Sequence, residues 1–273
     1  MPSTVNRESY ADASDRLLAD TGKATTAQLA TVADEILSVA GLLRAEPRLR
    51  RALTDPSRRG EERAGLLRRL LSGKLSKSTV DALMVLVAGR WGRPNDLLDA
   101  TERLGVDTLL RAADRAGALA DVEDELFRFG QIVSGDAELA VTLSDPGAST
   151  ERRVKLVETL LKSKVQAATL RLVEVAIEGF GGRSFELSLT RMVELAAARR
   201  DREVAYVTVA KPLDDAEEQR LAAKLSDMYG RQVSLKVDVD PKVIGGVSVQ
   251  VGSDLYDGTI LRRLNEAKQA FAK

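Results

Sequence analysis

Residues 53–74, LTDPSRRGEERAGLLRRLLSGK, recur as residues 143–164, LSDPGASTERRVKLVETLLKSK. The match continues in both directions at a constant offset of 90 residues and without a gap, over residues 29–98 and 119–188. A constant offset over this length indicates a duplicated helical unit. Chance similarity between leucine-rich helices does not explain it, because turn residues that do not follow helical periodicity recur as well.

The matched positions include acidic residues, arginines and turn glycines as well as apolar residues of the helical faces. We call residues 29–98 the first copy and residues 119–188 the second copy. The identical pairs include Leu29/Leu119, Val32/Val122, Asp34/Asp124, Glu35/Glu125, Asp55/Asp145, Pro56/Pro146, Glu61/Glu151, Arg63/Arg153, Lys74/Lys164, Gly89/Gly179, Gly92/Gly182 and Arg93/Arg183.

The composition excludes several classes of function. The chain has 273 residues with 41 basic and 41 acidic side chains, a balance that does not favour a dedicated nucleic-acid binder. It contains neither Cys nor His, which removes disulfides, thiolate nucleophiles, imidazole bases and most zinc sites. We expect a mostly helical soluble protein with no membrane span and no signal peptide, because no apolar run approaches about 18 residues.

Apolar residues at three- and four-residue spacing predict short amphipathic helices through both copies. Such helices are marginal alone and are expected to pack into bundles. In and before the first copy they are expected at about 8–18, 26–44, 47–53, 57–71, 79–89 and from 95 through 109. In the second copy they are expected at about 116–134, 136–143, 149–163, 166–179 and after 184 to about 201.

From residue 202 the pattern changes from helical spacing to β-branched and alternating runs. Residues 204–209, 233–239 and 247–251 predict three strands, the second of them half-buried because Val233, Leu235, Val237 and Val239 alternate with polar residues. A helix is expected from Asp214 or Asp215 to Tyr229, and a last helix from Ile260 to the C-terminus.

We therefore predict an α+β protein that is mainly α. A helical bundle of two tandem units of about 90 residues is expected to occupy residues 1–110 and 111–202. A small β-α-β-β-α domain is expected to occupy residues 203–273.

The C-terminal domain carries a motif of turn residues. It comprises Pro212-Leu213, Asp240-Pro241, Ile244-Gly245-Gly246-Val247, Val251-Gly252 and Asp257-Gly258-Thr259 followed by Ile260. This motif resembles that of the delta subunit family of F-type ATP synthases, which includes the mitochondrial oligomycin-sensitivity-conferring protein. Members commonly have Ser where this chain has Thr259. The motif residues with an expected structural role are Pro212, Gly245, Gly246, Gly252, Asp257, Gly258 and Thr259.

The resemblance extends upstream and covers nearly the whole chain. Tyr10-Ala11-Asp12-Ala13 is similar to the family's opening helix, and the two Asp-Pro turns and Gly-Arg connectors are similar to parts of its six-helix bundle. The chain departs from the family in length, because ordinary members have one helical unit and this chain has about 90 further residues of bundle.

The resemblance implies a non-catalytic stator subunit in the peripheral stalk of the proton-translocating F1Fo ATP synthase. Such a subunit links the F1 catalytic hexamer to the b subunits of Fo and resists rotary torque. The helical bundle is expected to hold N-terminal segments of the alpha subunits, and the C-terminal domain to join the b subunits. The expected location is the cytoplasmic face of the cell membrane, as a peripheral protein. The resemblance implies no catalytic, cofactor-binding or metal-binding residue in this chain, and no nucleic-acid partner.

Two alternatives stay open at the level of the sequence. One is a helical-repeat adaptor or scaffold unrelated to ATP synthase; the other is an enzyme, which the absence of His and Cys disfavours. Gly179–Gly182 is similar to the start of a dinucleotide loop, but Ser184 stands where glycine is needed and a helix precedes it. Gly73-Lys74 lacks the following Ser or Thr and the upstream Gly of a phosphate loop.

Three further features have both a structural and a functional interpretation. Residues 44–69 hold nine Arg and four acidic residues, which suit either phosphate binding or the solvated side of two helices. Trp91 is expected to pack between the two units or to contact a partner. The acidic pairs at 214–215 and 217–218 are explained by a helix start, which favours negative charge.

Overall fold

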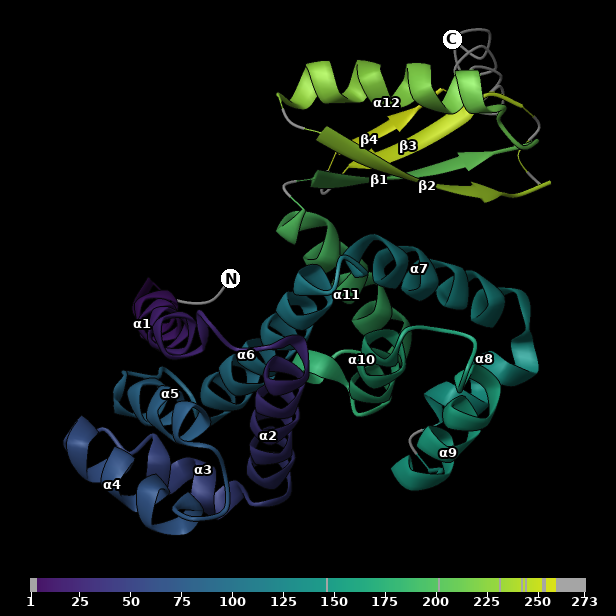
Figure 1. The fold of residues 1–273 in the computed structure, drawn as a ribbon. Helices are drawn as coiled ribbons and strands as arrows, with labels where there is room; N and C mark the ends of the chain where they lie inside the picture. The colour runs from purple at the N-terminus through teal and green to yellow at the C-terminus, as the bar shows by residue number, and fades with distance from the viewer. Residues whose placement is uncertain are drawn as a thin grey trace, which may run out of the picture. The chain divides into compact units, whose positions relative to one another are not determined.

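The computed structural model describes residues 4–145, 147–200, 202–230, 232–241, 243, 245–251 and 254–258. Helices fill the described part as far as residue 199, and a β-sheet with one helix follows (Figure 1). The mainly helical α+β fold predicted from the sequence is confirmed.

The helices before and within the first copy run longer than their predicted bounds at several ends. They are α1 (Thr4–Thr21), α2 (Thr26–Ala45), α3 (Pro47–Leu53), α4 (Gly60–Leu71), α5 (Lys77–Ala88) and α6 (Pro94–Arg115). Those that follow are α7 (Leu119–Gly135), α8 (Ala137–Ser144), α9 (Thr150–Leu161), α10 (Ala167–Ile177), a short 3-10 helix η1 (Phe180–Gly182) and α11 (Phe185–Arg199).

The duplication is visible in the bounds of the helices. Helix α9 begins and ends 90 residues after α4, α10 begins 90 residues after α5, and α6 begins 90 residues after α1. The turns after the matched helices α4 and α9 have the same left-handed backbone geometry. Gly73 has φ +75°, and its counterpart Ser163 has φ +69°. Ser163 is the one residue other than glycine with a positive φ in the described part of the chain. The repeat therefore preserves a left-handed turn even where glycine has been replaced.

The helical core around the first copy is built from α1 to α6. Its buried residues are almost all aliphatic and include Leu17, Ile36, Leu43, Leu53, Leu67, Leu83, Leu86, Leu97 and Leu104. Helix α2 buries a wide stripe of apolar residues, which includes Leu29, Ile36, Leu37, Val39 and Leu43.

By length and composition alone, α2 is apolar enough to cross a membrane, which the sequence analysis did not anticipate. In the structure, its residues pack both into the core around the first copy and against α6. Burial of its wide apolar stripe inside the bundle therefore explains its hydropathy.

The C-terminal part is a four-stranded mixed sheet with α12 on one face (Figure 1). The strands are β1 (Arg202–Val209), β2 (Gln232–Val239), β3 (Val247–Val251) and β4 (Asp254–Asp257), in the order β2-β1-β3-β4. Helix α12 (Asp215–Tyr229) connects β1 to β2, which pair in parallel, whereas β3 pairs antiparallel with both β1 and β4.

The three predicted strands and the helix between the first two are confirmed, and a fourth strand is added. Asp257 ends β4, where a turn was expected. Strand β4 has four mostly exposed residues, which carry little strand signal in the sequence. It forms because β3 offers it an unpaired edge. The predicted last helix from Ile260 lies outside the described residues.

The described chain divides into two compact units. One contains the described residues up to Val122 together with Val141–Ser188, and the other contains Glu123–Ala140 and the described residues from Leu189 onward. The division of the chain into segments 1–110, 111–202 and 203–273 stays a prediction.

Candidate partner-binding surfaces

A buried ion pair fixes α2 against α6. The carboxylate of Glu102 on α6 is 1% exposed and accepts hydrogen bonds from Arg44 Nη2 at 2.6 Å and from the backbone N–H of Gly181 at 2.7 Å. Arg44 also pairs with Glu178 at the end of α10. Burial raises the pKa of Glu102, and the Gly181 N–H and Arg44 oppose that shift. The pair therefore connects α2, α6 and the end of α10.

The same contacts give Gly179–Gly182 a structural role. Gly179, Gly181 and Gly182 all have positive φ, a backbone geometry that favours glycine. The amide of Gly181 points at the carboxylate of Glu102. The segment follows α10 and not a strand, so the interpretation as a structural connector is confirmed.

Two further contacts place α2 along both α6 and α10. Asp34 accepts a hydrogen bond from Arg171 Nε at 2.8 Å. A Cβ on Gly105 of α6 would lie 2.7 Å from the Leu37 side chain, so a larger residue there would force Leu37 of α2 to move. Helix α2 therefore contacts α6 by close packing and α10 by an ion pair.

A second buried ion network joins the start of α7 to the C-terminal sheet. Glu123 is 0% exposed and pairs with Arg200 Nη1 at 2.7 Å and with Lys236 Nζ at 3.0 Å. Lys236, which is 3% exposed, also pairs with Asp124 at 2.5 Å and lies 5.5 Å from the ring centroid of Phe127. The network fixes α7 on the face of the sheet opposite α12.

The prediction that β2 is half-buried was therefore wrong. Ser234 donates to Glu123 at 2.8 Å, and Gln131 Nε2 donates to the carbonyl oxygen of Val237 at 3.2 Å. Both sides of β2 are covered in its middle, because α7 binds the polar side that alternation assigns to solvent.

Asp34 and Asp124 stand at matched positions of the two copies and make matched contacts. Asp34 on α2 binds a cation of the second copy, Arg171, and Asp124 on α7 binds a cation of the C-terminal sheet, Lys236. In each copy the first long helix is therefore joined by an acidic residue to the part of the chain that follows. The repeat shows both aspartates in the sequence, but neither cation has a matched counterpart.

A groove opens between α1, α4 and α5, and we call it the first groove. It has a volume of about 720 Å³ and is lined by Arg16, Glu61, Ala64, Gly65, Arg68, Lys77, Asp81, Met84, Val85 and Ala88. Small and apolar side chains form its floor, whereas Asp81 on its rim pairs with Arg16 at 3.0 Å and with Lys77 at 2.5 Å. An apolar floor with a charged rim suits an amphipathic helix.

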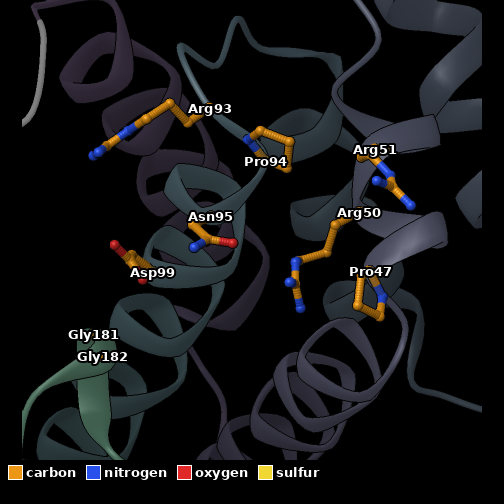
Figure 2. A pocket seen from close by; sticks show the side chains of 9 residues that line it. All are labelled: Pro47, Arg50, Arg51, Arg93, Pro94, Asn95, Asp99, Gly181 and Gly182. Carbon is orange, nitrogen blue, oxygen red and sulfur yellow. The ribbon is translucent and has the colours of Figure 1, made fainter.

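A second cavity, of about 530 Å³, is lined by Pro47, Arg50, Arg51, Arg93, Pro94, Asn95, Asp99, Gly181 and Gly182. Figure 2 shows the residues of α3 on one side and those of α6 and the glycine turn on the other. Arg50 caps the end of α2 by donating to the carbonyl oxygens of Leu43 and Arg44. Burial raises the pKa of Asp99, and nearby Asp96 raises it further.

Several arginines of the basic segment 44–69 have structural roles. Arg63 is buried and donates to five backbone carbonyl oxygens, of Val87, Asp55, Arg58, Ala88 and Gly89. Arg44 pairs with Glu102 and Glu178, and Arg50 caps the end of α2. These contacts favour the structural interpretation of the segment over phosphate binding.

Trp91 packs within the helical core around the first copy. Its Nε1 donates to the carbonyl oxygen of Leu86 at 3.0 Å, and its half-buried ring lies against the core of α1 to α6. The expectation that it packs between the two copies is therefore not met.

The motif residues of the C-terminal domain lie in its turns and at strand ends. Pro212 is exposed after β1, and Gly245 and Gly246 have φ +143° and +86°, as expected for glycines in a special backbone geometry. Gly258 donates its N–H to the carbonyl oxygen of Val247 at 2.9 Å. Gly252 and Thr259 lie outside the described residues. A structural role for the motif stays a prediction.

The fold defines a mainly helical α+β protein with a duplicated helical unit, in which buried ion pairs join neighbouring elements. The family model described as "ATP synthase delta (OSCP) subunit" matches residues 106–271. "ATP synthase subunit delta" of Salinispora arenicola is 60% identical over 100% of both chains, and that of Streptomyces griseus is 45% identical over 98% of this chain and 99% of its own.

The chain therefore belongs to the ATP synthase delta (OSCP) subunit family. It is a non-catalytic stator subunit of the membrane-associated ATP synthase complex.

The family match begins within α6 and covers the second copy and the C-terminal sheet. The residues before 106, including the resemblance at Tyr10–Ala13, lie outside that match but inside the full-length matches to relatives. Among solved structures, a chain of the Toxoplasma gondii mitochondrial ATP synthase hexamer matches with a TM-score of 0.36 and 19% sequence identity. The match covers 62% of this chain and 95% of that chain, and it carries no argument.

Proposed function

We propose that the chain joins the F1 catalytic hexamer to the b subunits at the cytoplasmic face of the membrane. In this proposal the helical bundle holds N-terminal segments of the alpha subunits, and the C-terminal domain binds the b subunits. The observation that carries the proposal is the series of buried ion pairs that join α2 to α6 and α7 to the sheet.

These pairs suit a part that bears torque. Breaking a buried ion pair by removing one partner costs about 3–5 kcal/mol, whereas an exposed pair contributes about 0–1 kcal/mol. A connector whose joints are buried keeps its geometry under load, and its partners are then held by broad helical surfaces with slow dissociation.

The test is a pull-down of the tagged full chain from its own solubilised membranes, followed by identification of the bound subunits. Recovery of the alpha, beta and b subunits in a fixed ratio supports the proposal. Recovery of an unrelated set of proteins would favour the adaptor interpretation instead.

A further inference from the structure

Six of the nine arginines in the basic segment 44–69 lie at the surface. The other three, Arg44, Arg50 and Arg63, make ion-pair, capping or backbone contacts within the bundle. The six exposed residues are Arg48, Arg51, Arg58, Arg59, Arg68 and Arg69. Packing of the bundle therefore does not explain their presence.

The second copy shows that the helices form without basic residues at these six positions. The matched residues are, in the same order, Glu138, Val141, Ala148, Ser149, Glu158 and Thr159. The charge is reversed at two of them, since Arg48 matches Glu138 and Arg68 matches Glu158. Helices α8 and α9 nevertheless form where α3 and α4 form in the first copy. The six arginines therefore belong to the surface of the first copy and are not required by its fold.

Two of the six, Arg51 and Arg58, line a hollow beside the start of α6. The cavity of about 530 Å³ is lined by Arg50, Arg51 and Arg93 among others. A neighbouring cavity of about 510 Å³ is lined by Arg51, Arg58 and Arg93 among others. The two cavities share Arg51, Arg93 and Pro94, and we call them together the arginine hollow. Arg50 and Arg51 lie on its α3 side, and Arg93 lies across from them (Figure 2).

Four arginines and two carboxylates line the arginine hollow. The carboxylates belong to Asp55 and Asp99. Two of the arginines are already engaged, because Arg50 caps the end of α2 and Arg93 pairs with Asp96 at 2.9 Å. The other two arginines therefore decide what the hollow can bind.

These two, Arg51 and Arg58, are available to a ligand. Arg51 lines both cavities and forms no ion pair with another described residue. The Nε of Arg58 lies 3.6 Å from Asp55, which is a long ion pair at an exposed position. Asp55 accepts shorter hydrogen bonds from the N–H and the hydroxyl of Ser57, at 2.9 and 2.7 Å. Two guanidinium groups of the hollow can therefore receive carboxylates from outside the chain.

Apolar side chains lie among these arginines. Ala52, Pro56, Trp91 and Pro94 line the cavity of about 510 Å³, and Trp91 is half-buried. Trp and Arg are residue types enriched where the binding energy of an interface is concentrated. Segment 44–69 contains no lysine, and arginine suits carboxylates better because its planar guanidinium donates two parallel hydrogen bonds. The lining thus fits a peptide that carries both acidic and apolar side chains.

We propose that the arginine hollow binds an acidic segment of another ATP synthase subunit. Carboxylates of that segment pair with Arg51 and Arg58, and an apolar side chain of the segment covers Trp91. The source of the segment rests on the proposed function. A bare phosphate is a poorer match, because it makes no use of Trp91 and the two prolines.

A second copy of this chain is the main competing occupant. Residues 134–159 hold five acidic and three basic residues, so charge alone would allow them to enter the hollow of another copy. Such a contact joins unlike surfaces of two identical chains, and contacts of this kind extend into open filaments unless a ring closes. An acidic segment of a different subunit binds without this extension.

The test is the double variant Arg51→Glu/Arg58→Glu in the full-length chain. The matched control is Arg152→Glu/Lys155→Glu, which makes the same change of charge at exposed positions of the second copy. The association rate, dissociation rate and Kd are measured for solubilised ATP synthase from which this subunit has been removed, at low and at high salt. Urea unfolding followed by the fluorescence of Trp91 checks that each variant is folded.

We expect the double variant to bind about tenfold or more weakly at low salt, mainly through slower association. The difference should shrink at high salt, because the charges are exposed. The control should bind like the wild type. Arg51→Gln/Arg58→Gln removes the two charges without reversing them, so it should give a smaller loss in the same direction, and it decides the question if the Glu pair does not fold.

Unchanged binding by the folded double variant would overturn the inference and leave the proposed function intact. An equal loss in the control would also overturn it, because it would show an effect of overall charge and not of the hollow. Failure of the wild type to bind the depleted complex would overturn the proposed function and this inference with it.

A photo-crosslinking residue in place of Asn95 identifies the occupant. Asn95 is exposed and lines the cavity of about 530 Å³. In the assembled complex, the captured segment should belong to another subunit and be rich in Asp and Glu. Capture of a basic or uncharged segment, or of a second copy of this chain, would contradict the assigned chemistry.

Discussion

Arg63 offers the sharpest test of how the fold is held together. Its guanidinium donates to the turn before α4 through Nη1, at 3.1 Å to Asp55 and 2.8 Å to Arg58. It also donates to the end of α5, at 3.3 Å to Val87, 3.1 Å to Ala88 and 2.7 Å to Gly89. The last carbonyl oxygens of a helix have no partner within the helix, so Arg63 satisfies groups that are otherwise left unpaired.

Arg63→Met keeps much of the side-chain volume and removes all five donors. A hydrogen bond to a charged group contributes about 1.5–3 kcal/mol, but five bonds from one group are far from additive, and burial of the guanidinium costs part of the gain. We expect a loss of about 3 kcal/mol in the free energy of unfolding of the bundle around the first copy.

The assay is urea unfolding followed by fluorescence of Trp91, the single tryptophan of the chain. Trp91 lies against the core of α1 to α6, so its signal reports on that bundle. With a denaturant slope of about 2 kcal/mol/M, the midpoint should fall by about 1.5 M urea.

The matched control is Arg153→Met in the second copy. Arg153 is only half-buried and donates to Leu143 at 3.0 Å and, weakly, to Thr150 at 3.4 Å. We expect the Trp91 transition to be unchanged in this variant. A loss below about 1 kcal/mol for Arg63→Met, or equal losses in both variants, would refute the role assigned to Arg63.

Three further predictions concern a turn, a close approach and a buried carboxylate. Ser163→Gly should raise stability by up to about 1 kcal/mol and Gly73→Ser should lower it by about as much, since both positions have positive φ; the check is thermal unfolding, and opposite signs would contradict it. Gly60→Ala should destabilise α4, because its Cβ would clash with the Ala88 carbonyl oxygen; retention of the wild-type urea midpoint would be evidence against that contact. Burial raises the pKa of Glu102, so the folded state holds the proton of its carboxyl group more tightly than the unfolded state does. The stability of the wild type relative to Glu102→Gln should therefore fall as pH rises above 4.5, and urea midpoints that show no such trend would contradict the assignment.

Local sequence patterns predicted much of the fold for a physical reason. Helical spacing, Asp-Pro turns and β-branched alternation are properties of short segments, and they placed α2, α5, α12 and β1 to β3 near their observed bounds. Strand β4 was missed because its formation depends on the edge of β3 and not on its own four residues.

The candidate surfaces depend on contacts that no local pattern contains. Lys236 lies on the polar side of an alternating strand and so was assigned to solvent, yet it is buried under Glu123 and Asp124. The one available signal was the recurrence of Asp34 as Asp124, which marks matched positions at which both copies make an ion pair. The sequence showed that recurrence but did not show which cations pair with the two aspartates.

The central claim, that this chain is a non-catalytic stator subunit, is tested most directly by coupling. Membrane vesicles stripped of F1 and of this subunit are re-supplied with F1 alone or with F1 and the chain, and both ATP hydrolysis and ATP-driven proton pumping are measured. The account predicts that the chain restores pumping while leaving the hydrolysis rate of soluble F1 unchanged. Full pumping without the chain would contradict it.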